Sequence, residues 1–448
     1  MIILYWAITT SFGIAGTLGY FEYAPEWLLA ELGGIVLVAA RTLLGKKPLG
    51  DYISPAGLCF VAWILYANAY YLVYTYVSYN PVGFSFEKST IDLGFFLSFT
   101  SVSFFGFLFE LFTMNLKRQE SPIIKLNFIQ YIQPFPYSVV VMVGLLVIGY
   151  FGSIAASGAF SMIGKVDRLT LLDATETGKV WLMHYALTGA TIYFLYTGGV
   201  AKLGKIYNRW LVGLTLASFW ICYFMLGNRR GILTVLLAGG IVFTWKNKLR
   251  LRHFVVGFSV LLALMLIGIV RQATGSQVDR LGSAIQIING IGEFYFPHLT
   301  LLQAINNKDI PLLGSTFVGW LPNFIGAKFS GDSYLFLAQQ FARDVAPTGT
   351  EKFMGYAYMP LTEAYINFGV LGALIAPLMI VGAFWVLEKL FGKKSLPLLI
   401  VSAMALDINR GEFGAVMMQY TLFILSGLLL MLLAFISNKM RLSATKIR

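Results

Sequence analysis

The feature that most constrains this chain is a series of apolar runs of about 20 residues, separated by short charged segments. Runs of that length match the hydrocarbon thickness of a bilayer, where every backbone polar group must be satisfied within a helix or a closed barrel. The runs are continuous and do not alternate in polarity, which argues against a barrel. With 58% hydrophobic and 12% charged residues, the chain is unlike a soluble globular protein. We therefore predict an all-α, polytopic integral membrane protein.

Twelve helices are predicted from the runs. The first begins at Ile2 without a charged leader or a cleavage site, so we expect a retained helix and no signal peptide. The eleventh is short enough to be re-entrant. The predicted helices cover residues 2–20, 27–44, 56–79, 91–114, 135–155, 181–198, 210–227, 231–245, 253–270, 360–387, 395–408 and 414–436.

Charge is distributed unequally between the two sets of connecting segments. If the N-terminus is cytoplasmic, 20 of the 33 lysines and arginines lie on the cytoplasmic side, with only four acidic residues. The positive-inside rule then predicts that both termini are cytoplasmic. The net charge of +12 is thus a topology signal and requires no nucleic-acid partner.

Two long segments, at 156–180 and 271–359, are predicted on the non-cytoplasmic side. The longer one divides the chain into residues 1–270 with about nine helices, a loop at 271–359, and 360–448 with about three helices. Apolar residues recur in this loop near helical spacing, so we expect an amphipathic helix on the membrane or on the bundle. These residues are Leu281, Ile285, Ile288, Tyr295, Leu299 and Leu302.

Arginines on the outward side are candidates for binding an anion. Arg229 and Arg230 lie in the tight turn Gly227-Asn-Arg-Arg-Gly231, with Arg230 at the predicted start of a helix. The helix dipole disfavours a cation there, whereas guanidinium groups and a helix N-terminus together bind phosphate. The alternative is that Arg229 caps the preceding helix and that Arg230 reaches the lipid headgroups.

Three further arginines have similar alternatives. Arg410 repeats the pattern in the turn Asp407-Ile-Asn-Arg-Gly-Glu412, where it could instead pair with a neighbouring acid. Arg271 and Arg280 begin the long loop, where they could hold a pyrophosphate or act as interfacial anchors.

Two residues are candidate general bases. His298, the only histidine of the long loop, could act near neutral pH, although a lone histidine is more often structural. Glu363 lies just inside the next apolar helix, where it could instead complement the helix dipole. Its neighbours Tyr365 and Asn367 are candidates for binding the pyrophosphate or the glycan. The outward carboxylates are scattered and the two cysteines lie in apolar runs, so we predict no metal and no cofactor.

The chain resembles the O-antigen polymerases over roughly residues 210–390. The resemblance rests on the Gly227–Gly231 turn, the late external loop with Gly314 through Pro322, and the start of the helix Glu363-Ala-Tyr-Ile-Asn-Phe-Gly-Val-Leu-Gly372. It implies a glycosyltransferase bundle of the GT-C type in the bacterial inner membrane, with a periplasmic site. It also implies transfer of a growing glycan from undecaprenyl pyrophosphate to the non-reducing end of a new lipid-linked repeat unit.

Such a transfer needs cations at the leaving pyrophosphate and a base at the attacking hydroxyl. Arginines 229, 230, 271 and 280 could meet the first need, and Glu363 or His298 the second, in an inverting, metal-independent reaction. Two other functions stay open. An O-antigen ligase would resemble its relatives through a histidine where this chain has residues 359–362, and a flippase would place charges at the midplane. A co-polymerase that regulates chain length is an open candidate partner.

Overall fold

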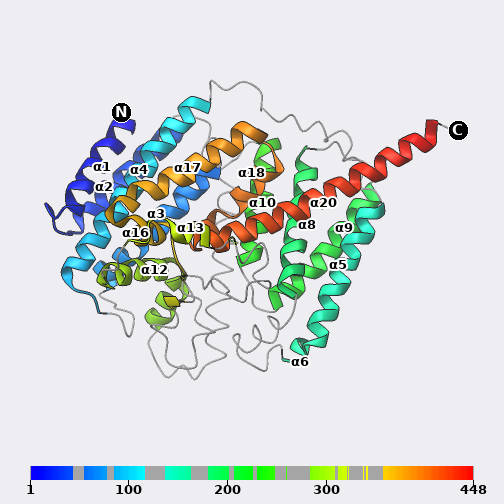
Figure 1. Cartoon of the computed structure of the whole chain (residues 1–448), viewed down its shortest axis with the longest axis horizontal. Coiled ribbons are helices and arrows are strands. Elements are labelled where there is room, and N and C mark those ends of the chain that lie inside the picture. The colour runs from blue at the N-terminus through cyan, green and yellow to red at the C-terminus, as the bar shows by residue number, and fades with distance from the viewer. Residues whose placement is uncertain are drawn as a thin grey trace. The chain divides into compact units, whose positions relative to one another are not determined.

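The structure is a computed structural model that describes residues 2–43, 55–77, 85–116, 137–162, 180–200, 206–225, 230–247, 259, 283–307, 311–319, 321, 337, 340–341 and 357–446. Throughout these ranges the regular elements are helices (Figure 1). The chain divides into two compact units. Unit 1 comprises Met1–Ser121, Gly282–Val386 and Ala405–Met418, and unit 2 comprises Pro122–Leu281, Leu387–Met404 and Gln419–Arg448.

Unit 1 begins with four helices: α1 (Ile2–Thr17), α2 (Glu26–Leu43), α3 (Pro55–Val77) and α4 (Lys88–Leu116). Helix α1 packs along α4, and two glycines make the approach possible. A Cβ atom at Gly13 would lie 2.4 Å from Thr100 Oγ1, and one at Gly16 would lie 2.1 Å from a ring carbon of Phe96. Small residues thus bring the two backbones together, as in other membrane helix pairs.

The amphipathic helix expected in the long loop is present as α12 (Ser283–Asn307), which packs on α3 and α4. Three of its predicted apolar positions, Tyr295, Leu299 and Leu302, are buried in one hydrophobic core. Leu281 and the side chains of Ile285 and Ile288 lie outside the described structure. The other buried members of this core come from α2, α3 and α4: Leu28, Tyr70, Tyr71, Ile91, Phe95, Phe96 and Phe99.

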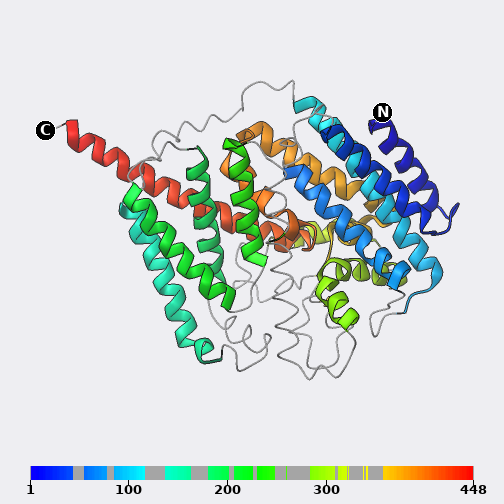
Figure 2. The same ribbon diagram turned by 180° about the vertical axis from the view of Figure 1, so that it is seen from behind.

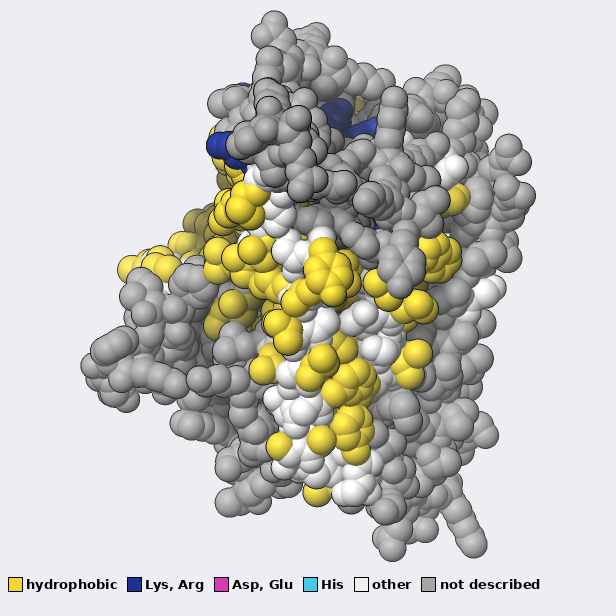
Figure 3. Space-filling view, turned by 90° about the vertical axis from the view of Figure 1, so that its right-hand side faces the viewer, with side chains coloured by type: hydrophobic (Ala, Val, Ile, Leu, Met, Phe, Trp, Pro, Cys, Tyr) yellow, Lys and Arg dark blue, Asp and Glu magenta, His cyan; other side chains and the backbone are white. Residues whose placement is uncertain are grey.

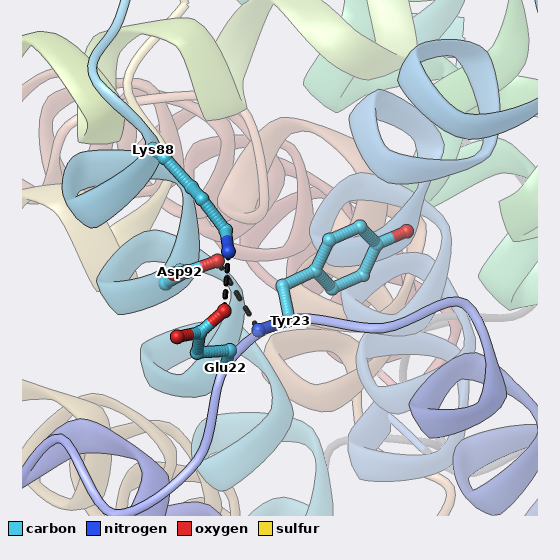
Figure 4. A network of polar contacts seen from close by, with 4 residues as sticks. All are labelled: Glu22, Tyr23, Lys88 and Asp92. Carbon is cyan, nitrogen blue, oxygen red and sulfur yellow. Dashed lines mark hydrogen bonds and ion pairs between the residues drawn. The ribbon is translucent and has the colours of Figure 1, made fainter.

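Polar contacts fix the connection between α1 and α2 to the start of α4 (Figure 4). The Lys88 ammonium forms an ion pair with the Glu22 carboxylate, and the Tyr23 backbone N–H donates to Asp92 Oδ1 at 3.1 Å. The Tyr23 hydroxyl also bonds Thr75 Oγ1 on α3. This short connection is therefore attached to two neighbouring helices.

The remaining elements of unit 1 position the residues of interest. They are α13 (Ser315–Gly319), α16 (Pro360–Phe368), the 3-10 turn η4 (Gly369–Leu371), most of α17 (Gly372–Phe391), α19 (Ala405–Ile408) and the start of α20 (Phe413–Lys446). Helix α16 packs on α12 and contacts α13.

Unit 2 contains α5 (Tyr137–Ala156), α6 (Ala159–Met162), α8 (Val180–Val200), α9 (Ile206–Met225), α10 (Arg230–Lys246), α18 (Leu396–Ala403) and the rest of α20 (Figure 2). Helix α5 packs on α8 and α9, while α10 packs on α8 and α18. At Gly189 of α8, a Cβ atom would lie 1.8 Å from Ser426 Oγ of α20, so a side chain would not fit there.

Five described helical segments are long and apolar enough to cross a membrane: Pro55–Thr75, Lys88–Thr113, Tyr137–Ala156, Pro360–Phe391 and Phe413–Met440. Ile2–Thr17 and Gly231–Trp245 are shorter apolar helices. Hydrophobic side chains predominate among the described atoms of the face in Figure 3. The chain is thus an all-helical, multi-pass membrane protein in the part described.

Two of the twelve predicted helices need separate comment. The ninth, at residues 253–270, lies outside the described residues except for position 259. The short eleventh, at 395–408, consists of α18 and α19, with a turn at Met404 between them. The total of twelve spans, the GT-C fold and the orientation in the membrane stay predictions.

Candidate functional site

Glu363 lies in the first turn of α16, as predicted, and local sequence explains why the helix begins there. Met359 is extended, and Pro360 occupies the first helical position, where its missing N–H costs no hydrogen bond. An acidic residue in the first turn also complements the helix dipole. The short helix ends at Gly369, whose φ of 60° favours glycine.

The carboxylate of Glu363 accepts hydrogen bonds from two other elements. Thr316 Oγ1 of α13 donates to Oε1 at 2.8 Å, and the Phe413 backbone N–H donates to Oε2 at 2.5 Å. Phe413 is the first residue of α20, so its N–H is one of those that a helix leaves without an internal partner. Glu363 is only 1% exposed and therefore joins three elements from the interior.

Asn367, one turn further along α16, completes this network. Its amide donates to Thr316 Oγ1 at 2.6 Å and to the Glu363 carbonyl at 2.7 Å, while its Oδ1 accepts from the Gly314 N–H at 2.9 Å. Gly314 has a φ of 88°, which suits glycine in this turn. We call Thr316, Glu363, Asn367 and the Phe413 N–H the Glu363 cluster. Tyr365, on the same helix, is half-buried.

Arg410 belongs to the turn that leads into this cluster. The Arg410 N–H and the Gly411 N–H both donate to the Asp407 carbonyl, at 3.1 and 2.8 Å. Asn409 fixes the turn to α3, because its amide donates to the Cys59 carbonyl at 3.2 Å. Arg410 is half-buried and lies three residues before Phe413. The structure thus brings Glu363, Asn367 and the Arg410 turn together.

His298 lies on α12 and is completely buried. Its Nε2 lies 2.7 Å from the Tyr71 hydroxyl, and its Nδ1 lies 3.5 Å from Ser98 Oγ. The Tyr71 hydroxyl donates to the Ile91 carbonyl at 3.2 Å, which assigns the imidazole proton to Nε2. The ring also stacks on Tyr70, with the ring centroids 5.4 Å apart.

Burial lowers the pKa of His298 to about 3, so the imidazole is neutral throughout the physiological range. His298 and Glu363 belong to different hydrogen-bond networks on two helices in contact. Thr300, two residues after His298, connects the helices: its hydroxyl contacts Thr362 Oγ1 at 3.5 Å and donates to the Ala357 carbonyl at 3.2 Å.

The remaining predicted arginines are not brought to this cluster within the described structure. Arg229, Arg271 and Arg280 lie outside the described residues. Arg230 is the first residue of α10, as predicted, but only its backbone is described. In the part of the chain described, no group of three or more histidine, cysteine, aspartate or glutamate side chains could hold a metal ion.

The sequence analysis missed two polar residues that the structure singles out. Thr316 contacts both Glu363 and Asn367, yet it precedes them by about 50 residues and has no motif of its own. His184 of α8 stacks on Tyr223 with centroids 4.2 Å apart and bonds its hydroxyl at 3.0 Å. Both rings abut Gly231, where a Cβ atom would lie 2.9 Å from Tyr223 and 3.3 Å from His184. The start of α10 therefore needs its glycine.

The Glu363 cluster combines a buried carboxylate, a hydroxyl and a helix N-terminus next to a turn that carries an arginine. Such a set can hold an anion through the arginine while the carboxylate orders the turn. The chain matches no protein-family model, and neither a curated protein nor a solved structure is similar to it.

Proposed function

We propose that the chain is an integral-membrane glycosyltransferase that polymerises lipid-linked oligosaccharide repeat units of the O-antigen kind. The growing glycan would be transferred from undecaprenyl pyrophosphate to the non-reducing end of a new repeat unit. The proposal includes a site on the periplasmic face of a bacterial inner membrane, with both termini in the cytoplasm, in agreement with the distribution of basic residues along the sequence.

The observation that carries the proposal is the hydrogen bond between the Phe413 N–H and Glu363. It joins two segments that the sequence marks separately, the helix that contains Glu363 and the turn that contains Arg410. A carboxylate and an arginine-bearing turn thereby belong to one buried network in unit 1. These are the residue types that a transfer from a pyrophosphate requires.

In the proposed reaction, the bond between the anomeric carbon and the pyrophosphate oxygen breaks. The acceptor hydroxyl oxygen bonds to that carbon, and its proton passes to a base, for which Glu363 and His298 are the candidates. Arginines stabilise the charge that develops on the leaving pyrophosphate. Because Glu363 already accepts two hydrogen bonds, the geometry favours a role in ordering the Arg410 turn.

A surface-glycan gel of the source bacterium tests the proposal. Deletion of the gene should leave core lipid with a single repeat unit, and the intact gene should restore the ladder of longer polymers. Complementation with Arg410→Ala or Arg230→Ala should shorten the polymer. Arg41→Ala, an arginine on the predicted cytoplasmic side, is the matched control and should restore the full ladder.

Other outcomes of the gel identify other functions. Polymer that accumulates on its lipid carrier, unattached to core, would show a ligase. Loss of all exported repeat units would show a flippase. If both arginine variants give polymers of normal length, the role proposed for the arginines of the two turns is wrong.

A further inference from the structure

Another buried glutamate, Glu31, lies in unit 1 on α2 and takes no part in the networks described above. Its side chain is only 2% exposed. Neither carboxyl oxygen has a hydrogen-bond partner in the described structure. A carboxyl group in this position is unusual, because buried acids are normally paired or hydrogen-bonded.

Helix α1 covers this part of α2 closely. A Cβ atom at Gly34 would lie 2.3 Å from the Trp6 indole ring, and one at Gly33 would lie 2.8 Å from the Tyr5 hydroxyl. Trp6 is itself completely buried. The surroundings of Glu31 are thus aromatic and tightly packed, which removes the water that would otherwise solvate a charge.

The polar groups closest to Glu31 use their hydrogen-bond donors elsewhere. Tyr5 from α1 donates to the Ala30 carbonyl, and Tyr71 from α3 donates to the Ile91 carbonyl at 3.2 Å. The Asn68 amide donates to the Ile64 carbonyl at 3.0 Å, and it is also the one described donor that acts on the carboxyl group, although outside regular hydrogen-bond geometry. Of these groups, only the Asn68 amide can therefore stabilise a carboxylate.

No cation compensates the carboxyl group either. The titratable groups that interact electrostatically with Glu31 are the phenols of Tyr5 and Tyr71. No described lysine, arginine or histidine contributes such an interaction, from α4 or from any other described helix packed against α2. An ionised carboxylate here would have no counter-charge and only the Asn68 amide as a donor.

From this geometry we propose that Glu31 is a proton-binding site, which carries its proton at neutral pH while α1 covers α2. Burial of a carboxylate without a counter-charge costs far more than its protonation at neutral pH. The ligand of this site is the proton. Separation of α1 from α2 would admit water and release the proton, so proton binding and closure of the two helices are coupled. This inference is independent of the proposed glycosyltransferase activity.

Infrared difference spectroscopy of the purified full chain in lipid nanodiscs tests the site. The wild type at neutral pH should show the carbonyl stretch of a protonated carboxylic acid, which decreases as the buffer becomes alkaline. Glu31→Gln should abolish this signal. Glu26→Gln, at the exposed start of the same helix, is the matched control and should keep the signal. Glu31→Asp retains an acid and should shift the signal without removing it.

Melting temperatures of the same samples show whether the ligand of Glu31 is a proton or a metal cation. Glu31→Gln resembles the protonated acid in shape and charge, so its melting temperature should equal that of the wild type at neutral pH. If Glu31→Gln leaves the acid signal unchanged, the proposal is wrong. It is equally wrong if exchange of sodium for potassium alters the melting temperature of the wild type and not of the variant, because the ligand would then be a metal cation.

Discussion

Two of the four buried glutamates described in unit 1 are in opposite situations. Glu363 and Glu31 are 1% and 2% exposed, so burial does not distinguish them. Glu363 accepts hydrogen bonds from a threonine hydroxyl and from the first N–H of a helix, whereas neither oxygen of Glu31 accepts one of regular geometry in the described structure and only the Asn68 amide acts on it as a donor. The difference teaches that donors, and not burial alone, decide what a buried carboxyl group does. Glu363 connects three elements through hydrogen bonds, and Glu31 is expected to hold a proton.

The largest expected effect separates the two acids directly. Glu363→Gln should lower the free energy of unfolding by about 2–3 kcal/mol, because one of its two donors would then face an amide N–H₂ group. Glu31→Gln should change it by less than about 0.5 kcal/mol, since the neutral acid and the amide are alike. Unfolding of both variants in mixed micelles, monitored by tryptophan fluorescence, measures the difference. Equal losses for the two variants would break the comparison.

The buried histidine His298 allows a further comparison, through the pH dependence of folding stability. The pKa of His298 is about 3 in the folded protein, against about 6.5 for an exposed histidine. As the pH falls from about 6.5 towards 3, the unfolded state binds a proton before the folded state does. The folded protein should therefore lose up to about 1.4 kcal/mol of stability per pH unit in this window.

His298→Gln should flatten this part of the stability profile, as measured by melting temperatures across the acidic range. Glu31 acts in the opposite direction, because a protonated buried acid stabilises the fold at lower pH and loses that effect as the pH rises. If the variant His298→Gln loses stability at acidic pH as the wild type does, other groups cause that loss.

The smallest effect on stability is expected for an acid that is ion-paired but exposed to solvent. Lys88 lowers the pKa of Glu22 by a hydrogen bond (Figure 4) and by its charge, yet both side chains are exposed. Solvent and salt screen such pairs. Glu22→Gln should therefore leave the melting temperature unchanged at physiological salt. A clear decrease would show that a partner alone matters, without burial.

Most helices could be predicted from the sequence because their signal is local. The continuous runs placed α3, α5 and α10 within about three residues of their observed ends. The periodicity of the long loop predicted α12, whose Tyr295, Leu299 and Leu302 are buried. Both signals depend only on residues within one helix, which apolar composition and periodicity report directly.

The networks around the candidate residues could not be predicted in the same way. Glu363 and Phe413 are 50 residues apart, and His298 and Tyr71 are 227 apart. Their pairing depends on how helices pack, which no local pattern encodes. Glu31 is different, because an acid within a membrane-length apolar run is itself a signal of function. The sequence analysis used it only as part of the charge distribution.

The break between α16 and α17 has a consequence for depth in the membrane. The apolar segment Pro360–Phe391 has 32 residues, which as one straight helix would extend about 48 Å, well beyond a hydrocarbon core of about 30 Å. At η4 the segment bends instead, and α17 alone, with 20 residues, has the length of that core. The nine residues of α16 can thus lie at the boundary of the hydrocarbon core, so that the buried Glu363 cluster lies near the membrane surface and not at the midplane.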